Sequence, residues 1–248
     1  MGDLSNSNFH FWFIESDLDG YLYSIFAPLN LGPEITIDLG KRKDLAYAHD
    51  VSIKQNCLVE GVSSLQVLQK LTLINQFPVV FSGQSITRHE WYRISLDLIL
   101  FRFSAIRDYA LNVVNSVYEL GLTQLEVNPR KVKKIIRDKY PSESFVVNKL
   151  DRISEVGGTL RKERNILAHE GMFDGFDQDL EFNKVLAMFE DANKVSPHYK
   201  EFEANYSNKM TNLYETLVKE SNQLVEELTK LCNHIANEFG VRYEKKSQ

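Results

Sequence analysis

Residues 164–169, with the sequence RNILAH, bring a permanent cation, an amide and a titratable imidazole together within two turns of one predicted helix. An imidazole can take a proton from a ribose 2′-hydroxyl, and a guanidinium can hold phosphate oxygens while negative charge builds on them. We therefore assign His169 and Arg164 as candidate catalytic residues, with Asn165 orienting the substrate or the imidazole. These groups suffice for RNA cleavage without a metal ion, and the sequence predicts neither a metal site nor a cofactor.

The helical period decides which of these side chains share a face. At about 100° per residue, Asn165 and His169 lie on one side of the helix, whereas Arg164 diverges from His169 by roughly 140°. Arg164 must therefore reach around the helix or serve a neighbouring protomer. The same arithmetic places Arg161 on the face of Asn165 and His169, and we predict that Arg161 and the adjacent Lys162 bind RNA.

A loose spacing of arginine and histidine carries little information. In a chain of this composition, roughly 0.8 matches to such a spacing are expected by chance, and roughly 0.06 when asparagine must follow the arginine directly. Arg42 and His49 also fit the loose spacing, but Lys43 follows the arginine and no strong helical pattern surrounds the pair. The alternative for the motif itself is structural: Arg164 is then a surface residue, and His169 is a helix C-terminal histidine favoured by the helix dipole.

The RNILAH segment resembles the Arg-Asn-x-x-x-His motif of HEPN domains, which are helical domains of many prokaryotic toxins and phage-defence proteins. Arg164, Asn165 and His169 match the motif, and the resemblance extends to the helical context over about residues 88–240. It implies an all-α, HEPN-like helical bundle that forms a two-fold homodimer, with a metal-independent endoribonuclease site in the shared cleft. It also makes an antitoxin, such as a nucleotidyltransferase-like protein, a candidate partner. Some members of the superfamily bind RNA or nucleotides without cutting.

Three hypotheses of different classes follow. In the preferred one, His169 takes the 2′-hydroxyl proton, Arg164 stabilises the phosphorane-like transition state, and the products carry a 2′,3′-cyclic phosphate and a 5′-hydroxyl. By two-fold symmetry, the second His169 of a dimer donates the leaving-group proton. The second hypothesis is a catalytically inactive helical module that binds RNA, a nucleotide or a protein. The third is an interaction protein in which the motif is accidental.

Composition limits the class of protein. With 248 residues, 43% of them hydrophobic and 25% charged, the chain can bury a sizeable core as one large domain or as one domain with an extension. Cys57 and Cys232 are isolated, which favours neither a disulfide framework nor a zinc site and indicates a reduced, cytoplasmic setting. No apolar run reaches the length of a membrane span and no basic region opens a secretion signal, so we expect a soluble protein with no membrane partner.

The charges are distributed unevenly along the chain, although the net charge is −5. Residues 128–164 hold eleven Lys and Arg against five Asp and Glu, a balance of +6 that leads directly into the motif. We therefore predict a local phosphate-binding face and assign Lys134 as an RNA-binding residue. The alternative is that the basic residues over 130–137 are only the solvated side of a short helix.

The N-terminal part of the chain combines strand and helix signals. Aromatic and β-branched runs at 9–14 and 21–26 flank Asp19-Gly20, which predicts a small β-hairpin. Apolar residues at every third position predict a helix within 61–75. Residues 1–85 are accordingly predicted to be an N-terminal extension of unknown role.

Residues 86–248 are predicted to be the HEPN-like helical domain. Its clearest helix begins at a capping box over 87–90 and continues for about thirty residues without Gly or Pro. Arg102 falls at the centre of the apolar stripe of this helix, so it must snorkel, meet a carboxylate or point into a polar cleft. We assign it as a further RNA-binding residue, with a buried ion pair as the alternative.

Three further features mark the helices around the motif. Asn128-Pro129 caps a short basic helix. Gly157 and Gly158 interrupt the next helix, either to bend the chain or to let another helix approach closely. Ser196-Pro197 starts the longest periodic segment, about forty residues in one helix or in two separated by a kink, whose apolar stripe is predicted to be core.

Overall fold

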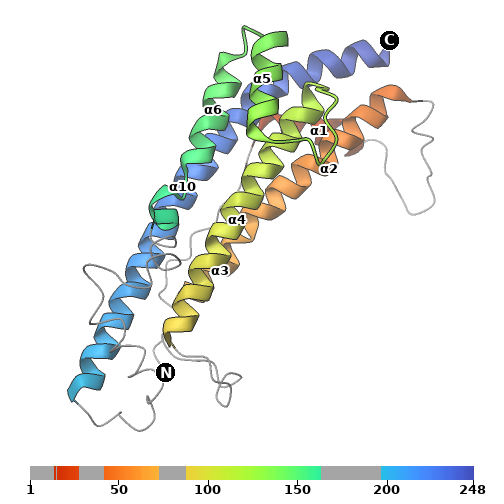
Figure 1. The fold of residues 1–248 in the computed structure, drawn as a ribbon. Helices are drawn as coiled ribbons and strands as arrows, with labels where there is room; N and C mark the ends of the chain where they lie inside the picture. Colours follow the sequence, from red (N-terminus) through yellow and green to blue (C-terminus); the bar gives the residue numbers. More distant parts are fainter. Residues whose placement is uncertain (1–13, 15, 28–41, 73–87, 163–196) are drawn as a thin grey trace. The chain divides into compact units, whose positions relative to one another are not determined.

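The computed structural model of the chain describes residues 14, 16–27, 42–72, 88–162 and 197–248 (Figure 1). Every regular element in these residues is an α-helix apart from a short 3-10 end after the first one, so the predicted all-α fold is confirmed. The helices are α1 (Asp17–Phe26), α2 (Lys43–Ser63), α3 (Leu65–Thr72), α4 (Arg88–Val117), α5 (Pro129–Lys139), α6 (Ser144–Glu155) and α10 (Pro197–Ser247). Among these helices, none has a stretch that is long and apolar enough to cross a membrane.

The described residues divide into two compact units, and α4 and α10 contribute residues to both. Unit 1 contains α3, residues 88–103 of α4, residues 157–162 and residues 197–221 of α10. Unit 2 contains α1, α2, α5, α6 and the C-terminal parts of α4 and α10.

Unit 2 is held together by a core of apolar side chains and by a few buried polar contacts. The Tyr47 hydroxyl donates to the Val117 carbonyl oxygen at 2.9 Å, which joins α2 to the end of α4. Lys149 of α6 donates to Glu227 of α10 at 2.7 Å, and both side chains are more than nine-tenths buried. The largest fully buried side chains of this unit are Leu18, Leu58, Ile106, Tyr118, Ile136, Ile153 and Phe239.

The predicted β-hairpin is wrong, because residues 21–26 belong to helix α1 and residues 9–13 lie outside the described part of the chain. Ser16 has an extended backbone, and its side chain accepts from the Asp19 N–H, which is a helix N-cap. Asp19, which suggested a turn, lies with Asp17 in the first helical turn, where the helix dipole favours negative charge. Leu18 and Leu22, four residues apart, are the buried side of the helix.

Helix α2 covers the segment around His49, where the sequence suggested no strong helical pattern. Its buried side chains recur at threes and fours, as a helix requires, but a polar residue, Gln55, interrupts the apolar series. Gln55 is buried because it donates to the Asp19 carboxylate at 2.9 Å. Because the hydrogen bond to Asp19 lets a glutamine occupy the core, the apolar pattern of α2 is weaker in the sequence than its burial in the fold.

The other helix predictions that fall on described residues are confirmed. Helix α4 spans 30 residues from Arg88, and α3 lies within the segment 61–75. The Asn128 side chain accepts from the Lys131 N–H at 2.9 Å and caps α5, with Pro129 in its first turn. The long periodic segment is a single helix, α10, of 51 residues.

Candidate functional site

The motif residues Arg164, Asn165 and His169 lie outside the residues that the structure describes, which stop at 162 and resume at 197. The described part of the candidate site is therefore the chain that leads into the motif, together with the cations predicted to assist it.

The turn before the motif is built on Gly157, which has a φ of +79° in the left-handed region. Its N–H donates to Oε2 of Glu220 in α10 at 2.7 Å. A β-carbon at Gly157 would lie 2.9 Å from Cδ2 of Phe103 in α4, so the phenyl ring lies directly against the glycine. Both reasons for a glycine apply here: a backbone conformation that L-residues rarely adopt and a close approach by another helix. A β-carbon at Gly158 would meet nothing within 4 Å.

A helix resumes directly after this turn, with residues 158–162 in helical conformation. The Arg161 N–H donates to the Gly157 carbonyl oxygen at 2.9 Å, so the turn residue also forms the first hydrogen bond of the new helix. The Arg161 side chain is half-buried and that of Lys162 is exposed. Within unit 1, contacts with α4 and α10 thus determine where the helix that carries these two predicted RNA-binding residues begins.

Arg102 lies at the edge of the buried face of α4 and not at its centre. The buried face runs through Ile99, Phe103 and Ile106, and the Arg102 side chain is half-exposed on its flank. Within the described ranges, no carboxylate pairs with this guanidinium. The predicted buried ion pair is therefore not present among these residues, and the cation has access to solvent.

Next to Arg102, helix α4 exposes a short apolar face. Ile94, Leu98 and Phe101 are 38%, 43% and 70% exposed. Their spacing of four and three residues places them on one side of the helix, within about 60° of each other. We call these three residues the α4 apolar face.

Lys134 belongs to a row of cations on α5, in unit 2. Arg130, Lys134 and Arg137 are exposed and recur at i, i+4 and i+7, so they share one face of the helix. None of the three forms an ion pair with a described residue. By contrast, Lys133 pairs with Asp151 of α6, and the apolar side of α5 is buried through Val132 and Ile136. We call Arg130, Lys134 and Arg137 the α5 basic row.

Comparison with known families identifies the chain. The profile of the HEPN_Cthe2314-like HEPN family matches residues 62–232, which is more than half of the chain and includes the Arg-Asn-x-x-x-His motif. The chain belongs to this HEPN family. No curated protein and no solved structure matches it. The HEPN assignment agrees with the all-helical fold and with the resemblance of residues 164–169 to the family motif.

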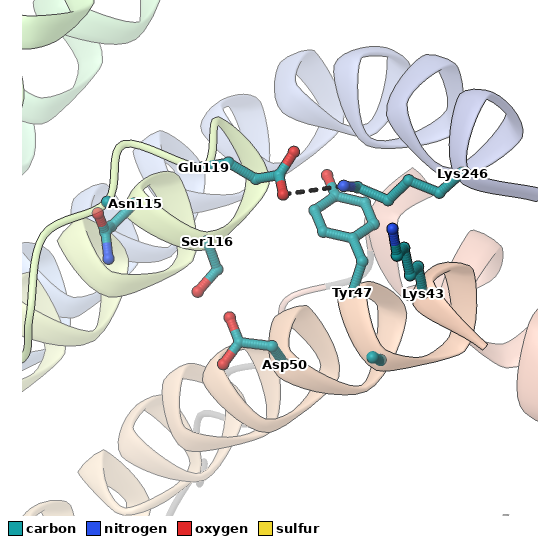
Figure 2. Close-up of a pocket in the computed structure, with 9 residues that line it drawn as sticks. Lys43, Tyr47, Asp50, Asn115, Ser116, Glu119 and Lys246 are labelled. Atoms are coloured by element: carbon teal, nitrogen blue, oxygen red, sulfur yellow. Dashed lines mark ion pairs between the residues drawn. The ribbon is translucent and has the colours of Figure 1, made fainter. Parts of the chain in front are cut away.

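The HEPN chain also has a pocket of about 590 Å³ within unit 2 (Figure 2). It lies between the first turns of α2, the end of α4 and the last turn of α10. Its lining residues are Lys43, Ala46, Tyr47, Asp50, Asn115, Ser116, Glu119, Gly121 and Lys246. The residues from α2 and α10 fall outside the segment that matches the HEPN profile, so the pocket is partly built by chain on either side of that segment.

Glu119 forms one edge of this pocket with a strained backbone. Its φ is 48°, the single positive value of a non-glycine residue in the described part of the chain. A glutamate at this position forms two ion pairs that glycine could not form: its carboxylate pairs with Lys246 at 3.0 Å and with Arg242 at 3.5 Å. The pocket cannot be predicted from the sequence, because its cations and carboxylates come from three segments that are far apart in the chain. The apolar spacing of α2 is the one feature of the sequence that points to any of these segments.

Proposed function

We propose that this HEPN chain is a metal-independent endoribonuclease with Arg164, Asn165 and His169 as its catalytic residues. The observation that carries the proposal is the family match, since residues 62–232 contain an arginine, an asparagine and a histidine at the spacing of the family motif. The charge balance of the segment before the motif is consistent with an anionic substrate.

In the proposed reaction, the imidazole of His169 removes the proton of a ribose 2′-hydroxyl, and the 2′-oxygen attacks the adjacent phosphorus. Arg164 stabilises the negative charge that builds on the phosphate oxygens. The bond from phosphorus to the 5′-oxygen breaks, which leaves a 2′,3′-cyclic phosphate and a 5′-oxygen that takes up a proton. In a two-fold dimer, the second His169 supplies that proton.

The turn at Gly157 supports this proposal by giving Arg161 and Lys162 a defined starting point. The turn is held by a charge-assisted hydrogen bond from α10 and by the packing of Phe103 from α4. A helix that begins at an anchored turn presents its first side chains in a reproducible direction. We propose that these two cations and Arg102 hold RNA phosphates beside the reacting one.

The homodimer that the proposed mechanism requires has a candidate surface in the α4 apolar face. Three exposed apolar side chains on one helical face are typical of a surface that a partner covers, and a second copy is the partner that supplies the second His169. Sedimentation analysis of the Phe101→Asp variant tests this. We expect a dimer for the unchanged chain and a monomer for the variant, whereas Leu125→Asp, at an apolar residue outside α4 that is 98% exposed, stays dimeric.

The experiment that tests the proposed activity is cleavage of RNA by the purified chain in excess chelator. We expect cleavage by the unchanged protein and its loss in His169→Ala and Arg164→Ala. His49→Ala and Arg93→Ala are matched controls, because both side chains are exposed on described helices and neither belongs to the motif. Cleavage that persists in His169→Ala at the original rate would overturn the proposal.

A second candidate function is RNA binding without cleavage, and the α5 basic row favours it. Three exposed, unpaired cations along one helical face suit a linear polyanion. Removal of Lys134 is then expected to reduce the slope of log affinity against log salt by about 0.7 for single-stranded RNA, whereas removal of the paired Lys133 changes it less.

We also propose a toxin or phage-defence role with an antitoxin partner, and this part of the proposal rests only on the HEPN resemblance. Co-purification of the chain with the product of a neighbouring gene tests it.

A further inference from the structure

The pocket in unit 2 presents polar groups that the protein itself does not satisfy. Ser116 is 7% exposed, and its hydroxyl forms no hydrogen bond with the residues that the structure describes. The carboxylate of Asp50 and the ammonium group of Lys43 also have no partner among those residues. These three groups are therefore free to form hydrogen bonds with a ligand.

These groups lie at two ends of the pocket. Figure 2 shows the Ser116 and Asp50 side chains together on one side, and Lys43, Lys246 and Tyr47 on the other. Lys43 and Asp50 are seven residues apart on α2, which corresponds to about 10 Å along the helix axis. The charge of Lys246 is already balanced by Glu119, at 3.0 Å, whereas that of Lys43 is not. One end therefore offers a cation and the other offers oxygen acceptors.

We propose that this pocket binds a small anionic sugar, with its phosphate or carboxylate group at Lys43 and its hydroxyl groups at Asp50 and Ser116. An ammonium group forms strong, charge-assisted hydrogen bonds with an anion. A carboxylate accepts hydrogen bonds from sugar hydroxyls, and a serine hydroxyl both donates and accepts. The volume of about 590 Å³ lies within the range of small-molecule sites.

The aromatic surroundings favour a sugar over a nucleotide. Tyr47, the one aromatic residue that lines the pocket, is 8% exposed. Its ring stacks on Phe239 at 5.4 Å between centroids, and the Lys246 ammonium group lies over it at 5.3 Å. Little aromatic surface is left on which a base can stack. The ligand is therefore recognised by its charge and its hydroxyl groups, and none of the lining residues belongs to the nuclease motif.

Titration calorimetry of the full chain with a set of small probes tests the chemistry. Binding of ribose 5-phosphate identifies a sugar phosphate as the ligand class, and binding of gluconate identifies a sugar acid. We expect ribose and inorganic phosphate to bind at least about tenfold more weakly than the anionic sugar that binds, because each lacks one set of contacts. The proposal would be overturned if ribose or inorganic phosphate bound as tightly as the anionic sugar. It would also be overturned if AMP bound tenfold more tightly than ribose 5-phosphate, or if neither ribose 5-phosphate nor gluconate bound.

Variants of the full chain test the location. Lys43→Ala and Asp50→Asn are each expected to weaken binding about tenfold, and Ser116→Ala about threefold or more. Lys139→Ala removes an exposed cation outside the pocket, and Ser104→Ala makes the same change as Ser116→Ala at an exposed position of α4. Both controls are expected to bind normally. Lys43 and Asp50 are exposed, so their variants fold, and unchanged affinity in both would overturn the assignment.

Discussion

Replacing Gly157 by alanine tests whether the turn before the motif is built as described. An L-residue at a φ of +79° costs about 1–2 kcal/mol relative to glycine. The new β-carbon would lie 2.9 Å from Cδ2 of Phe103, whose ring is 1% exposed and has little room to move, and such overpacking costs about 1–3 kcal/mol. We expect Gly157→Ala to lower the free energy of unfolding by about 2–5 kcal/mol.

Gly158→Ala is the matched control, since it adds the same methyl group one residue later. A β-carbon there meets nothing within 4 Å, and the residue is helical, so we expect a gain of about 0.4–1 kcal/mol. Urea unfolding followed by circular dichroism measures both. In a Phe103→Leu background, where the ring is gone, Gly157→Ala should cost only the backbone part relative to Phe103→Leu alone. Equal stabilities of Gly157→Ala and Gly158→Ala would refute the reasoning.

Three other predictions concern unit 2. Lys149→Met leaves the buried Glu227 carboxylate without its main partner and should cost about 3 kcal/mol, whereas Lys149→Met with Glu227→Leu should recover most of the loss in urea unfolding. Burial raises the pKa of the Cys232 thiol to about 12, so an aromatic disulfide reagent at pH 8 should modify Cys232 only after denaturation. The Arg42 guanidinium lowers the pKa of Asp44 to about 2, so Asp44 stabilises the fold above a pH of about 4, and Asp44→Asn should remove part of the stability loss seen between about pH 4 and 2.

Local signals in the sequence predicted the helices wherever capping and apolar spacing agreed. The Asn128-Pro129 cap and the long apolar series after Pro197 were sufficient for α5 and α10. The signals conflicted at residues 21–26, where aromatic side chains favoured a strand. The helix forms there because Ser16 caps it and because Leu18 and Leu22 bury the same face. That burial depends on tertiary packing, which the local pattern does not contain.

The candidate site was predictable only in its chemistry. The types and spacing of Arg164, Asn165 and His169 pointed to the HEPN family, which the profile match then established. The two readings of the glycine pair could not be separated from sequence, because the choice depends on a ring, that of Phe103, from a helix more than fifty residues earlier. One edge of the pocket is formed where the fold brings Lys246 to Glu119. No local sequence pattern predicts a contact between residues so far apart in the chain.

The chemistry of the RNA ends tests the central claim most directly. Purified chain is incubated with RNA in excess chelator, and the termini of the fragments are identified for the unchanged protein and for His169→Ala. The proposed mechanism predicts 2′,3′-cyclic phosphate and 5′-hydroxyl ends from the unchanged protein and no fragments from His169→Ala. Fragments with 3′-hydroxyl and 5′-phosphate ends, or identical cleavage by both proteins, would contradict it.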